Sequence, residues 1–331
     1  MPPVATERRA PEIAVAVPSH NRPLRLRWLL NSLEEQTLPR ERWEVVVGHD
    51  SGPETRELLR THPLARDGTL REAYVPPGTG GSGDHRNLAW RGATAPIIAF
   101  VDDDCRVPPD FVANALEAAR RHPGAVVQGS TQPDPDELHL ERAAPHTHTR
   151  RVNPPTVWAH ACNIIYPREL LEELGGYWDE PVWGGEDTDL ALRAQRAGRD
   201  YVGAPEVLAY HAVVPHSFLT ALRWGFRWGD LALMVKRHPE LREHLPMWVF
   251  WKRTHVWLGP AAIGAILAHR RGARWAALAL PYLLHAAPQE YGTGPRGRIR
   301  VLAELPGRAA VDAAEMVSLA RGSARFRTFI L

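Results

Sequence analysis

Short apolar runs alternate with amphipathic helical patterns in the first part of the chain, and this alternation leaves few folds open. The runs at 13–18, 43–48 and 96–101 are typical of buried strands, and the run at 70–75 is typical of a weaker one. Strands interleaved with helices need crossover connections, which are right-handed and build a mostly parallel sheet. The sequence therefore predicts an α/β, Rossmann-like fold for this part of the chain.

The first helical pattern begins at Pro23, because proline is favoured in the first turn of a helix. The helical period places Leu24, Trp28, Leu29 and Leu33 on one face. We expect this face to pack against the predicted sheet.

Each of the three strongest strands runs directly into polar residues. Ser19 and His20 end the first, Asp50 ends the second, and an aspartate triplet at 102–104 ends the third. Ligands of open α/β sheets bind beyond the carboxyl ends of the strands. We therefore expect the functional residues to gather along one edge of the sheet.

The aspartate triplet is the strongest single indication of a metal. Consecutive carboxylates repel one another unless solvent or a cation compensates, and hard divalent cations prefer oxygen ligands. Alternate residues of an extended segment share a side, so Asp102 and Asp104 can face one ion while Asp103 faces away. A solvated acidic turn before Pro108 explains the same residues without a metal, so both interpretations stand at this point.

A second acidic cluster, GGEDTDL, opens a predicted helix at Glu186. Acids at a helix N-terminus are stabilised by the helix dipole, which explains one or two of them. The dipole does not explain the bulky Trp183 and the two glycines that precede Glu186 and Asp187. Glycine lets a backbone approach a ligand closely, so this cluster is a candidate for a general base.

The segment GTGGSG at 78–83 matches a dinucleotide-binding fingerprint and raises an alternative, a nicotinamide-dependent oxidoreductase. Two strand-like units precede it, however, and Pro76 and Pro77 separate it from its own weak strand. The glycines together with Arg86 also suit a diphosphate, because a guanidinium pairs with phosphate oxygens.

Most of the 16 histidines are not candidate metal ligands. His211 is the exception, because it follows a later strand-like run that can return beside the acidic clusters. A structural histidine is the simpler interpretation. The segment at 131–156 has no apolar period and many prolines, so we expect a long surface loop that can act as a lid.

Charge divides the chain into two parts. Residues 1–212 carry 23 basic and 31 acidic side chains, whereas residues 213–331 carry 17 and 7, a net charge of +10. The apolar runs at 256–268 and 275–287 are shorter than the ~20 residues of a membrane span, and tryptophans and arginines flank them. We expect a helical, basic region at 216–331 that binds a membrane surface, an acceptor or another subunit. A bundle that merely packs on the first domain is the alternative.

Composition points to an ordinary folded protein. The 44% hydrophobic and 24% charged residues argue against disorder and against a polytopic membrane protein. Two distant cysteines, Cys105 and Cys162, build no disulfide framework, and no secretory signal is evident. We therefore expect a cytoplasmic protein. The basic C-terminal region leads us to expect that it can attach to the inner face of the plasma membrane. The arginine bias fits base composition of the gene, and no nucleic acid partner is expected.

Four motifs in this order resemble the family 2 glycosyltransferases: PSHNRP, VVVGHDSG, IIAFVDDD and GGEDTDL, followed by the histidine of AYH. The resemblance covers roughly 10–215. It implies a GT-A catalytic domain at 1–215, inverting transfer of a sugar from a nucleoside diphosphate donor, and assistance by Mg²⁺ or Mn²⁺. A lipid-linked or envelope glycan is one acceptor class that it allows.

The resemblance also assigns roles. Asp187 matches the general base, and Asp104, Asp102 and His211 match the metal ligands of the DxD motif and its histidine. Residues on the donor nucleotide side are Pro18, Ser19, His20, Asp50, Arg86, Asp102 and Asp103. Residues on the acceptor side are Trp183, Gly185 and Glu186.

Two positions depart from the family pattern. His49 stands where the family usually has the first acid of a pair, and His20 stands where a tyrosine is common. The sequence therefore leaves the base of the donor open, along with the sugar, the acceptor and the oligomeric state. A membrane-attached scaffold with an inactive transferase domain is a further alternative, although each expected acidic role has its carboxylate.

Overall fold

The computed structural model describes residues 10–178, 184–287 and 294–331, which form two compact units. The sheet unit comprises the described residues of 1–137, 149–182 and 186–212. The helical unit comprises those of 138–148, 183–185 and 213–331.

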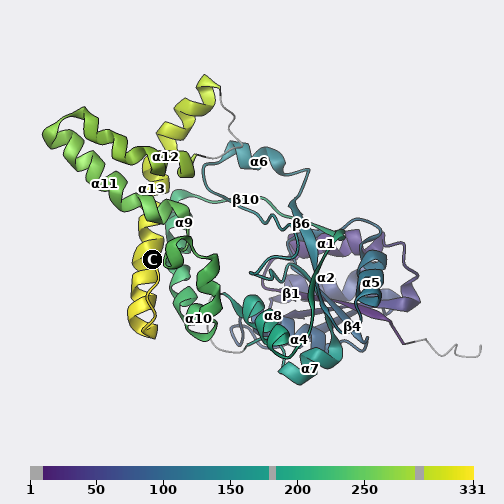
Figure 1. Cartoon of the computed structure of the whole chain (residues 1–331). Coiled ribbons are helices and arrows are strands. Elements are labelled where there is room, and N and C mark those ends of the chain that lie inside the picture. The colour runs from purple at the N-terminus through teal and green to yellow at the C-terminus, as the bar shows by residue number, and fades with distance from the viewer. Residues whose placement is uncertain (1–9, 179–183, 288–293) are drawn as a thin grey trace, which may run out of the picture. The chain divides into compact units, whose positions relative to one another are not determined.

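The sheet unit is built on an eight-stranded mixed sheet in the order β3-β2-β1-β4-β8-β6-β9-β5. Figure 1 labels β1, β4 and β6 of this sheet. The first four strands along the chain are parallel neighbours, as the sequence predicts. They are β1 (Ile13–Ser19), β2 (Trp43–His49), β3 (Leu70–Tyr74) and β4 (Ile97–Val101). Their carboxyl ends therefore lie at one edge.

The other half of the sheet carries the later strands. β8 is antiparallel to β4 and β6, β9 is parallel to β6, and β5 is antiparallel to β9. Their bounds are β5 (Cys105–Arg106), β6 (Val126–Pro133), β8 (Asn163–Pro167) and β9 (Tyr201–His211). This pairing returns the end of β9 to the segment that follows β4.

Helices cover both faces of the sheet because successive strand residues point to opposite sides. Val15 of β1 belongs to one core cluster, with leucines of α1, and Ala16 belongs to the other, with side chains of α4 and α8. The helices are α1 (Pro23–Glu34), α2 (Pro53–Thr61), α3 (Pro63–Arg66), α4 (Ser82–Gly92), α5 (Phe111–Arg121), α7 (Arg168–Leu174) and α8 (Glu186–Arg196).

Two expectations about this unit were wrong. Leu24 is 58% exposed, and the buried stripe of α1 is Leu26, Leu29, Leu30 and Leu33. The predicted loop at 131–156 begins inside β6 and also contains a helix and a short strand in the helical unit. Main-chain pairing with β9 forms the end of β6, and such pairing needs no apolar period.

The helical unit centres on the long helix α13 (Pro295–Phe326). Its other elements are α6 (Leu138–Ala143), β7 (Thr147–His148), β10 (Val214–Pro215), α9 (Phe218–Gly225), α10 (Leu231–Arg237), α11 (Arg253–Arg271) and α12 (Leu280–Ala286), with short 3-10 turns between them. The predicted helical character of this region is thus confirmed. Among the described helices, none is both long and apolar enough to cross a bilayer.

Candidate active site

A buried carboxylate lies where the ends of β1 and β2 meet. Asp50 is 1% exposed, and its Oδ1 lies 2.6 Å from Nδ1 of His20. The Gly78 amide donates to its Oδ2 at 2.9 Å, and His85 of α4 approaches Oδ1 to 3.4 Å. Burial acts to raise the pKa of Asp50, but the His20 and Gly78 contacts outweigh it and the pKa lies below its usual value. Asp50 is therefore an ionised acceptor held at the end of the strand.

His49, the residue at the end of β2, is bound to an acid of the neighbouring strand. Its Nδ1 accepts from the Ser51 amide at 3.1 Å, so Nε2 carries the proton and donates to Glu72 at 3.0 Å. Burial lowers the pKa of His49. Glu72 also lines a cavity of about 330 Å³ with Ser51, Arg56 and Tyr74. An imidazole paired with a carboxylate thus stands where the resemblance leads us to expect a single acid.

The aspartate triplet after β4 splits in three directions. Asp102 accepts from Arg86 at 2.8 Å, and Asp103 accepts from the Ser19 hydroxyl at 2.8 Å. Asp104 accepts from Arg22 at 2.7 Å. Each carboxylate therefore has its own partner, which lowers the repulsion that three adjacent acids would otherwise suffer.

Their surroundings shift the pKa values of Asp102 and Asp103 in opposite directions. Burial acts to raise the pKa of Asp102, but the Arg86 guanidinium outweighs it and the pKa is lowered. Burial and then the charge of Asp104 raise the pKa of Asp103 to about 7. Of these two carboxyl groups, Asp103 therefore binds a proton more easily than Asp102.

His211 ends β9, and the antiparallel register with β5 sets it opposite Cys105, directly after Asp104. Its Nε2 lies 3.6 Å from Asp104 Oδ1, and its Nδ1 lies 2.8 Å from the carbonyl oxygen of Ala212. Because a carbonyl oxygen can only accept, Nδ1 donates to this carbonyl, and Nε2 is the ring atom that faces the carboxylate. An imidazole nitrogen beside a carboxylate oxygen is a donor set that fits a divalent cation.

Asp102 is less close to that pair. Among the described residues, three metal-ligand side chains lie within 4.8 Å of one another only in the helical unit, at His255, Asp312 and Glu315. That trio already holds a cation, because Lys252 Nζ lies 2.6 Å from Glu315. In the sheet unit, only Asp104 and His211 of the three expected ligands face each other, and Asp102 is engaged by Arg86.

Arg86 connects the aspartate triplet to the start of α8. Its guanidinium is buried and donates to Asp102 at 2.8 Å, to Glu186 at 2.8 Å and to the Ser82 hydroxyl at 2.7 Å. Burial acts to lower the pKa of Arg86, but Asp102 and Glu186 raise it well above its usual value, so the side chain is always charged. A single cation therefore holds the two acidic clusters of the sequence together.

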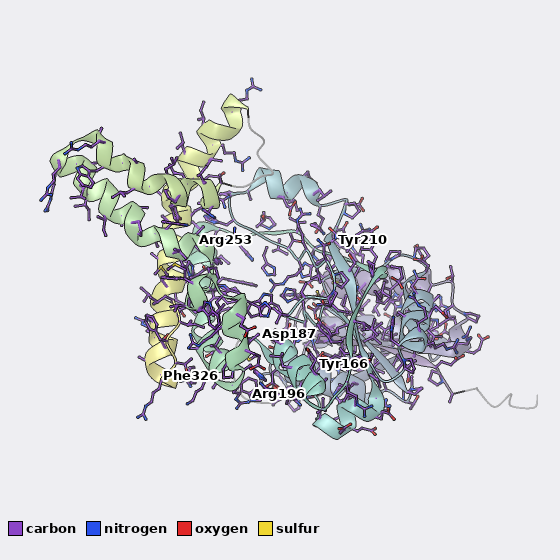
Figure 2. All side chains as sticks on the ribbon, viewed as in Figure 1. Tyr166, Asp187, Arg196, Tyr210, Arg253 and Phe326 are labelled. Carbon is purple, nitrogen blue, oxygen red and sulfur yellow. The ribbon has the colours of Figure 1, made fainter. Side chains whose placement is uncertain are left out.

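Asp187, labelled in Figure 2, stands in the first turn of α8. Its Oδ1 accepts from the Thr188 amide at 2.8 Å, and its Oδ2 accepts from the Ala161 amide at 3.3 Å. Burial raises the pKa of Asp187, although Arg86 opposes the effect, and burial together with Asp187 raises the pKa of Glu186. A desolvated carboxylate with an elevated pKa is suited to accept a proton.

The structure describes only some of the residues that the sequence predicts on the acceptor side. Trp183 lies outside the described residues. Gly185 belongs to the helical unit, has φ 98°, and a Cβ there would lie 2.5 Å from Cγ of Met234. Close packing on α10 and the positive φ therefore both require glycine at this position.

Sequence reasoning missed several residues of this edge. Arg22 holds the triplet, His85 stacks on His20 with ring centroids 6.2 Å apart, and burial together with Arg150 lowers the pKa of His160 to about 4. Arg22 follows the polar cluster at the end of β1 directly, so extending that cluster by two residues would have found it. No local pattern marks His85 or His160.

The glycine loop GTGGSG does not open the first strand–helix unit. It joins β3, the edge strand, to α4, and it supplies the Gly78 amide to Asp50. A dinucleotide fingerprint needs these glycines after a central strand. The oxidoreductase alternative therefore has no support in the fold.

Comparison with known proteins identifies the family of the chain. The sequence profile of glycosyl transferase family 2 matches residues 14–175, and that of glycosyl transferase family group 2 matches residues 97–288. A validoxylamine A glucosyltransferase of Streptomyces hygroscopicus is 28% identical over 282 residues, which cover 74% of this chain and 64% of that protein. The succinoglycan biosynthesis protein ExoM of Rhizobium meliloti is 28% identical over 83% of this chain and 90% of its own.

Solved structures show the same fold. A mannosyltransferase, PcManGT of Pyrobaculum calidifontis in complex with GDP-Man and Mn²⁺, superposes with a TM-score of 0.56 at 22% identity and covers 95% of this chain and 87% of its own. S. aureus TarS 1-349 in complex with UDP superposes with a TM-score of 0.55 at 18% identity, over 96% and 91% of the two chains.

The fold and the matched families define a class: the chain has the GT-A fold of glycosyltransferases. More particularly, the chain belongs to the family 2 glycosyltransferases, as its sequence motifs predict. It spans 64% and 60% of the length of the two validoxylamine A glucosyltransferases that it matches.

Proposed function

We propose that the protein transfers a sugar, with inversion, from a nucleoside diphosphate donor to an acceptor nucleophile, and that a divalent metal assists. One observation carries the proposal. Arg86 contacts both Asp102 and Glu186, so that the acidic strand end and the acidic helix start lie on two sides of one guanidinium. An inverting displacement needs a charged group near the leaving diphosphate and a base on the opposite side of the sugar.

On the donor side, the base and ribose lie at the ends of β1 and β2. Asp50 supplies an ionised acceptor for base N–H groups, and Pro18, Ser19 and His20 line the same strand end. The cavity beside Glu72 provides adjoining space. The diphosphate lies toward Arg86, with Asp102 and Asp103 next to it.

Mg²⁺ or Mn²⁺ bound at this edge would neutralise charge on the departing diphosphate. Asp104 and His211 are the side chains that would hold the ion, and Asp102 would join them by turning from Arg86. The orientation of His211 supports this assignment, since the Ala212 carbonyl accepts from Nδ1 and Nε2 is the ring atom on the side of Asp104.

On the acceptor side, Asp187 acts as the general base. The acceptor oxygen forms a bond to the anomeric carbon while the bond from that carbon to the diphosphate oxygen breaks, and the acceptor proton passes to Asp187. The Thr188 and Ala161 amides fix the orientation of the carboxylate. Trp183, Gly185 and Glu186 are the residues that we assign to acceptor binding.

The substrate class follows by analogy. Similar proteins include a structure with GDP-Man and Mn²⁺ and one with UDP, so a guanine or uracil nucleotide sugar is the first donor to test. We propose a saccharide acceptor, either free or part of a lipid-linked or envelope glycan. We further propose that residues 1–215 form the catalytic domain and that residues 216–331 hold this cytoplasmic enzyme at a membrane surface.

A thermal-shift screen of nucleoside diphosphates and their sugars, with Mn²⁺ and with chelator, tests the donor. A ligand that binds the folded state raises its apparent stability. We expect one nucleotide to raise the melting temperature with Mn²⁺ and to lose that effect in the chelator. Absence of any shift with every nucleotide sugar, or hydrolysis of donor that chelator leaves unchanged, would contradict the proposal.

The Asp187→Asn variant tests the base. We expect a loss of about 10² to 10⁴ in turnover with donor affinity preserved, because only proton transfer is removed. The matched control is Asp189→Asn, since Asp189 stands in the same helical turn but pairs with Arg193. Full turnover in Asp187→Asn would rule out this residue as the base.

A further inference from the structure

The helical unit carries a long hairpin, residues 253–286. α11 runs out from α13, and the 3-10 segment η5 (Ala273–Ala279) and α12 return along it (Figure 1). The two legs approach closely at Gly264, where an added Cβ would lie 2.7 Å from Cβ of Leu278. The hairpin is therefore a self-packed element with a root on α13 and a turn near residue 272.

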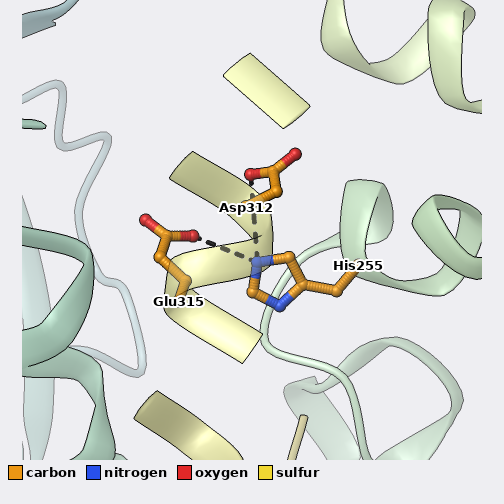
Figure 3. Close-up of side chains that lie close together, drawn as sticks. All are labelled: His255, Asp312 and Glu315. Atoms are coloured by element: carbon orange, nitrogen blue, oxygen red, sulfur yellow. Dashed lines mark hydrogen bonds and ion pairs between the residues drawn. The ribbon is translucent and has the colours of Figure 1, made fainter. Parts of the chain in front are cut away.

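Both legs are fastened to one turn of α13. Lys252 Nζ donates to Glu315 at 2.6 Å, and His255 Nε2 lies 3.0 Å from the same carboxylate. Tyr282, on the returning leg, donates to Asp312 at 2.9 Å. Figure 3 shows His255 facing Asp312 and Glu315, which lie three positions apart on the helix. Buried charged contacts are costly to break, so this root holds the hairpin in place.

Several large apolar side chains of the hairpin face solvent. Ile263 and Ile266 are each 55% exposed, and Leu284, beside the root, is 71% exposed. From residue 261 to residue 285, only Gly264 and Tyr282 are buried. Large apolar side chains gathered on one exposed element mark an interaction surface.

Charge identifies the partner. No Asp or Glu occurs between residues 244 and 289, and Arg270, Arg271 and Arg274 are exposed around the turn. An apolar face bordered by arginines complements an anionic bilayer, in which phosphates lie just outside the apolar layer.

We infer that the hairpin is an interfacial membrane-docking element. It inserts Ile263, Ile266 and Leu284 at the boundary between headgroups and acyl chains of an anionic phospholipid bilayer and sets the arginines of its turn at the phosphates. This inference rests on the proposed function in one respect: an enzyme with a lipid-linked acceptor would meet that acceptor at the membrane surface.

Co-sedimentation with vesicles tests the apolar face. The full-length protein is mixed with phosphatidylcholine vesicles that contain about 30% phosphatidylserine, and with pure phosphatidylcholine vesicles. We expect Ile263→Asp/Ile266→Asp to partition at least ~30-fold more weakly than wild type, since two inserted side chains become charged. The matched control is Leu219→Asp on α9, because Leu219 is 65% exposed in the same unit, and it should bind like wild type.

A second variant tests whether the arginines of the hairpin turn bind the lipid phosphates. Arg270→Gln/Arg271→Gln/Arg274→Gln should lose about 100-fold on anionic vesicles and change nothing on neutral ones. Failure of the wild type to sediment with anionic vesicles, or unchanged binding of either hairpin variant, would overturn the inference. So would light scattering that shows a wild-type dimer and a monomeric Ile263→Asp/Ile266→Asp, because a second copy would then cover the face.

Catalysis is measured separately in each variant as donor hydrolysis without vesicles. We expect unchanged hydrolysis and unchanged circular dichroism in all hairpin variants. Vesicle binding by a wild type that hydrolyses no donor would refute the proposed function and leave the docking element in place. The reverse result would refute only the docking element.

Discussion

Replacement of Arg86 by methionine should destabilise the sheet unit strongly. The guanidinium is 5% exposed and pairs with Asp102 and Glu186, each at 2.8 Å. Methionine fills similar volume but leaves both carboxylates, which are partly buried, without this cation. Removal of one partner from a buried ion pair costs about 3–5 kcal/mol, and we expect a loss of that size in the free energy of unfolding at pH 8.

The loss should shrink as the pH falls. In wild type, the pKa of Glu186 is already raised by burial and by Asp187, and loss of Arg86 removes the group that opposes this effect. A carboxyl group whose folded pKa exceeds its unfolded value destabilises the fold above that pKa and ceases to do so once it is protonated. The pKa of Asp102 is lowered in wild type, so wild type loses this contribution only below the ordinary carboxyl range. The difference between the two proteins is therefore larger at pH 8 than at pH 5.

Urea unfolding followed by circular dichroism measures the difference, and hydrogen exchange of the β4 amides assigns it to the sheet unit. Arg91→Met on the same helix is the matched control, since Arg91 is exposed, donates to the Gly175 carbonyl and lies over the Trp90 ring without any carboxylate partner among the described residues. This substitution should cost below about 1 kcal/mol. Arg86→Met/Glu186→Gln should recover part of the loss. A loss of less than about 1 kcal/mol in Arg86→Met, or one independent of pH, would refute the reasoning.

Three further predictions follow from the same geometry. Asp104→Ala should weaken Mn²⁺-dependent donor binding by at least about tenfold in calorimetry with metal and leave the weak binding measured in chelator unchanged; equal loss in both would contradict a metal role. Because burial raises the pKa of Asp187, the acid limb of kcat/KM should lie above the ordinary carboxyl range and vanish in Asp187→Asn, whereas an acid limb that persists unaltered would point to another group. Gly48→Ala should lower the free energy of unfolding by about 3 kcal/mol or more, because its Cβ would lie 2.1 Å from the His85 carbonyl oxygen; wild-type stability in urea would show that α4 can move away.

Local sequence pattern was enough to predict the alternating strands and helices, the parallel half of the sheet and the edge where the polar residues gather. The elements could be predicted because a run of four or more apolar residues and an amphipathic helix each have a local sequence pattern. The edge could be predicted because the carboxyl ends of parallel strands lie on the same side of a sheet. The helical N-terminus at Glu186 was visible for the same reason. The resemblance to the family supplied the residue roles that we propose.

Tertiary packing decided the rest. The end of β6 forms a strand without an apolar period, because hydrogen bonds to its partner strand satisfy its main chain. Helix α1 buries Leu26 in place of Leu24, because the sheet covers only part of the broad apolar face of the helix. Arg22 reaches Asp104 across 82 positions, and Arg86 reaches Glu186 across 100. Contacts between residues so far apart leave no local pattern. The sequence by itself determined which strands end in acids, and only the folded chain decided which cation each acid meets, because that choice depends on side chains brought together by strand order.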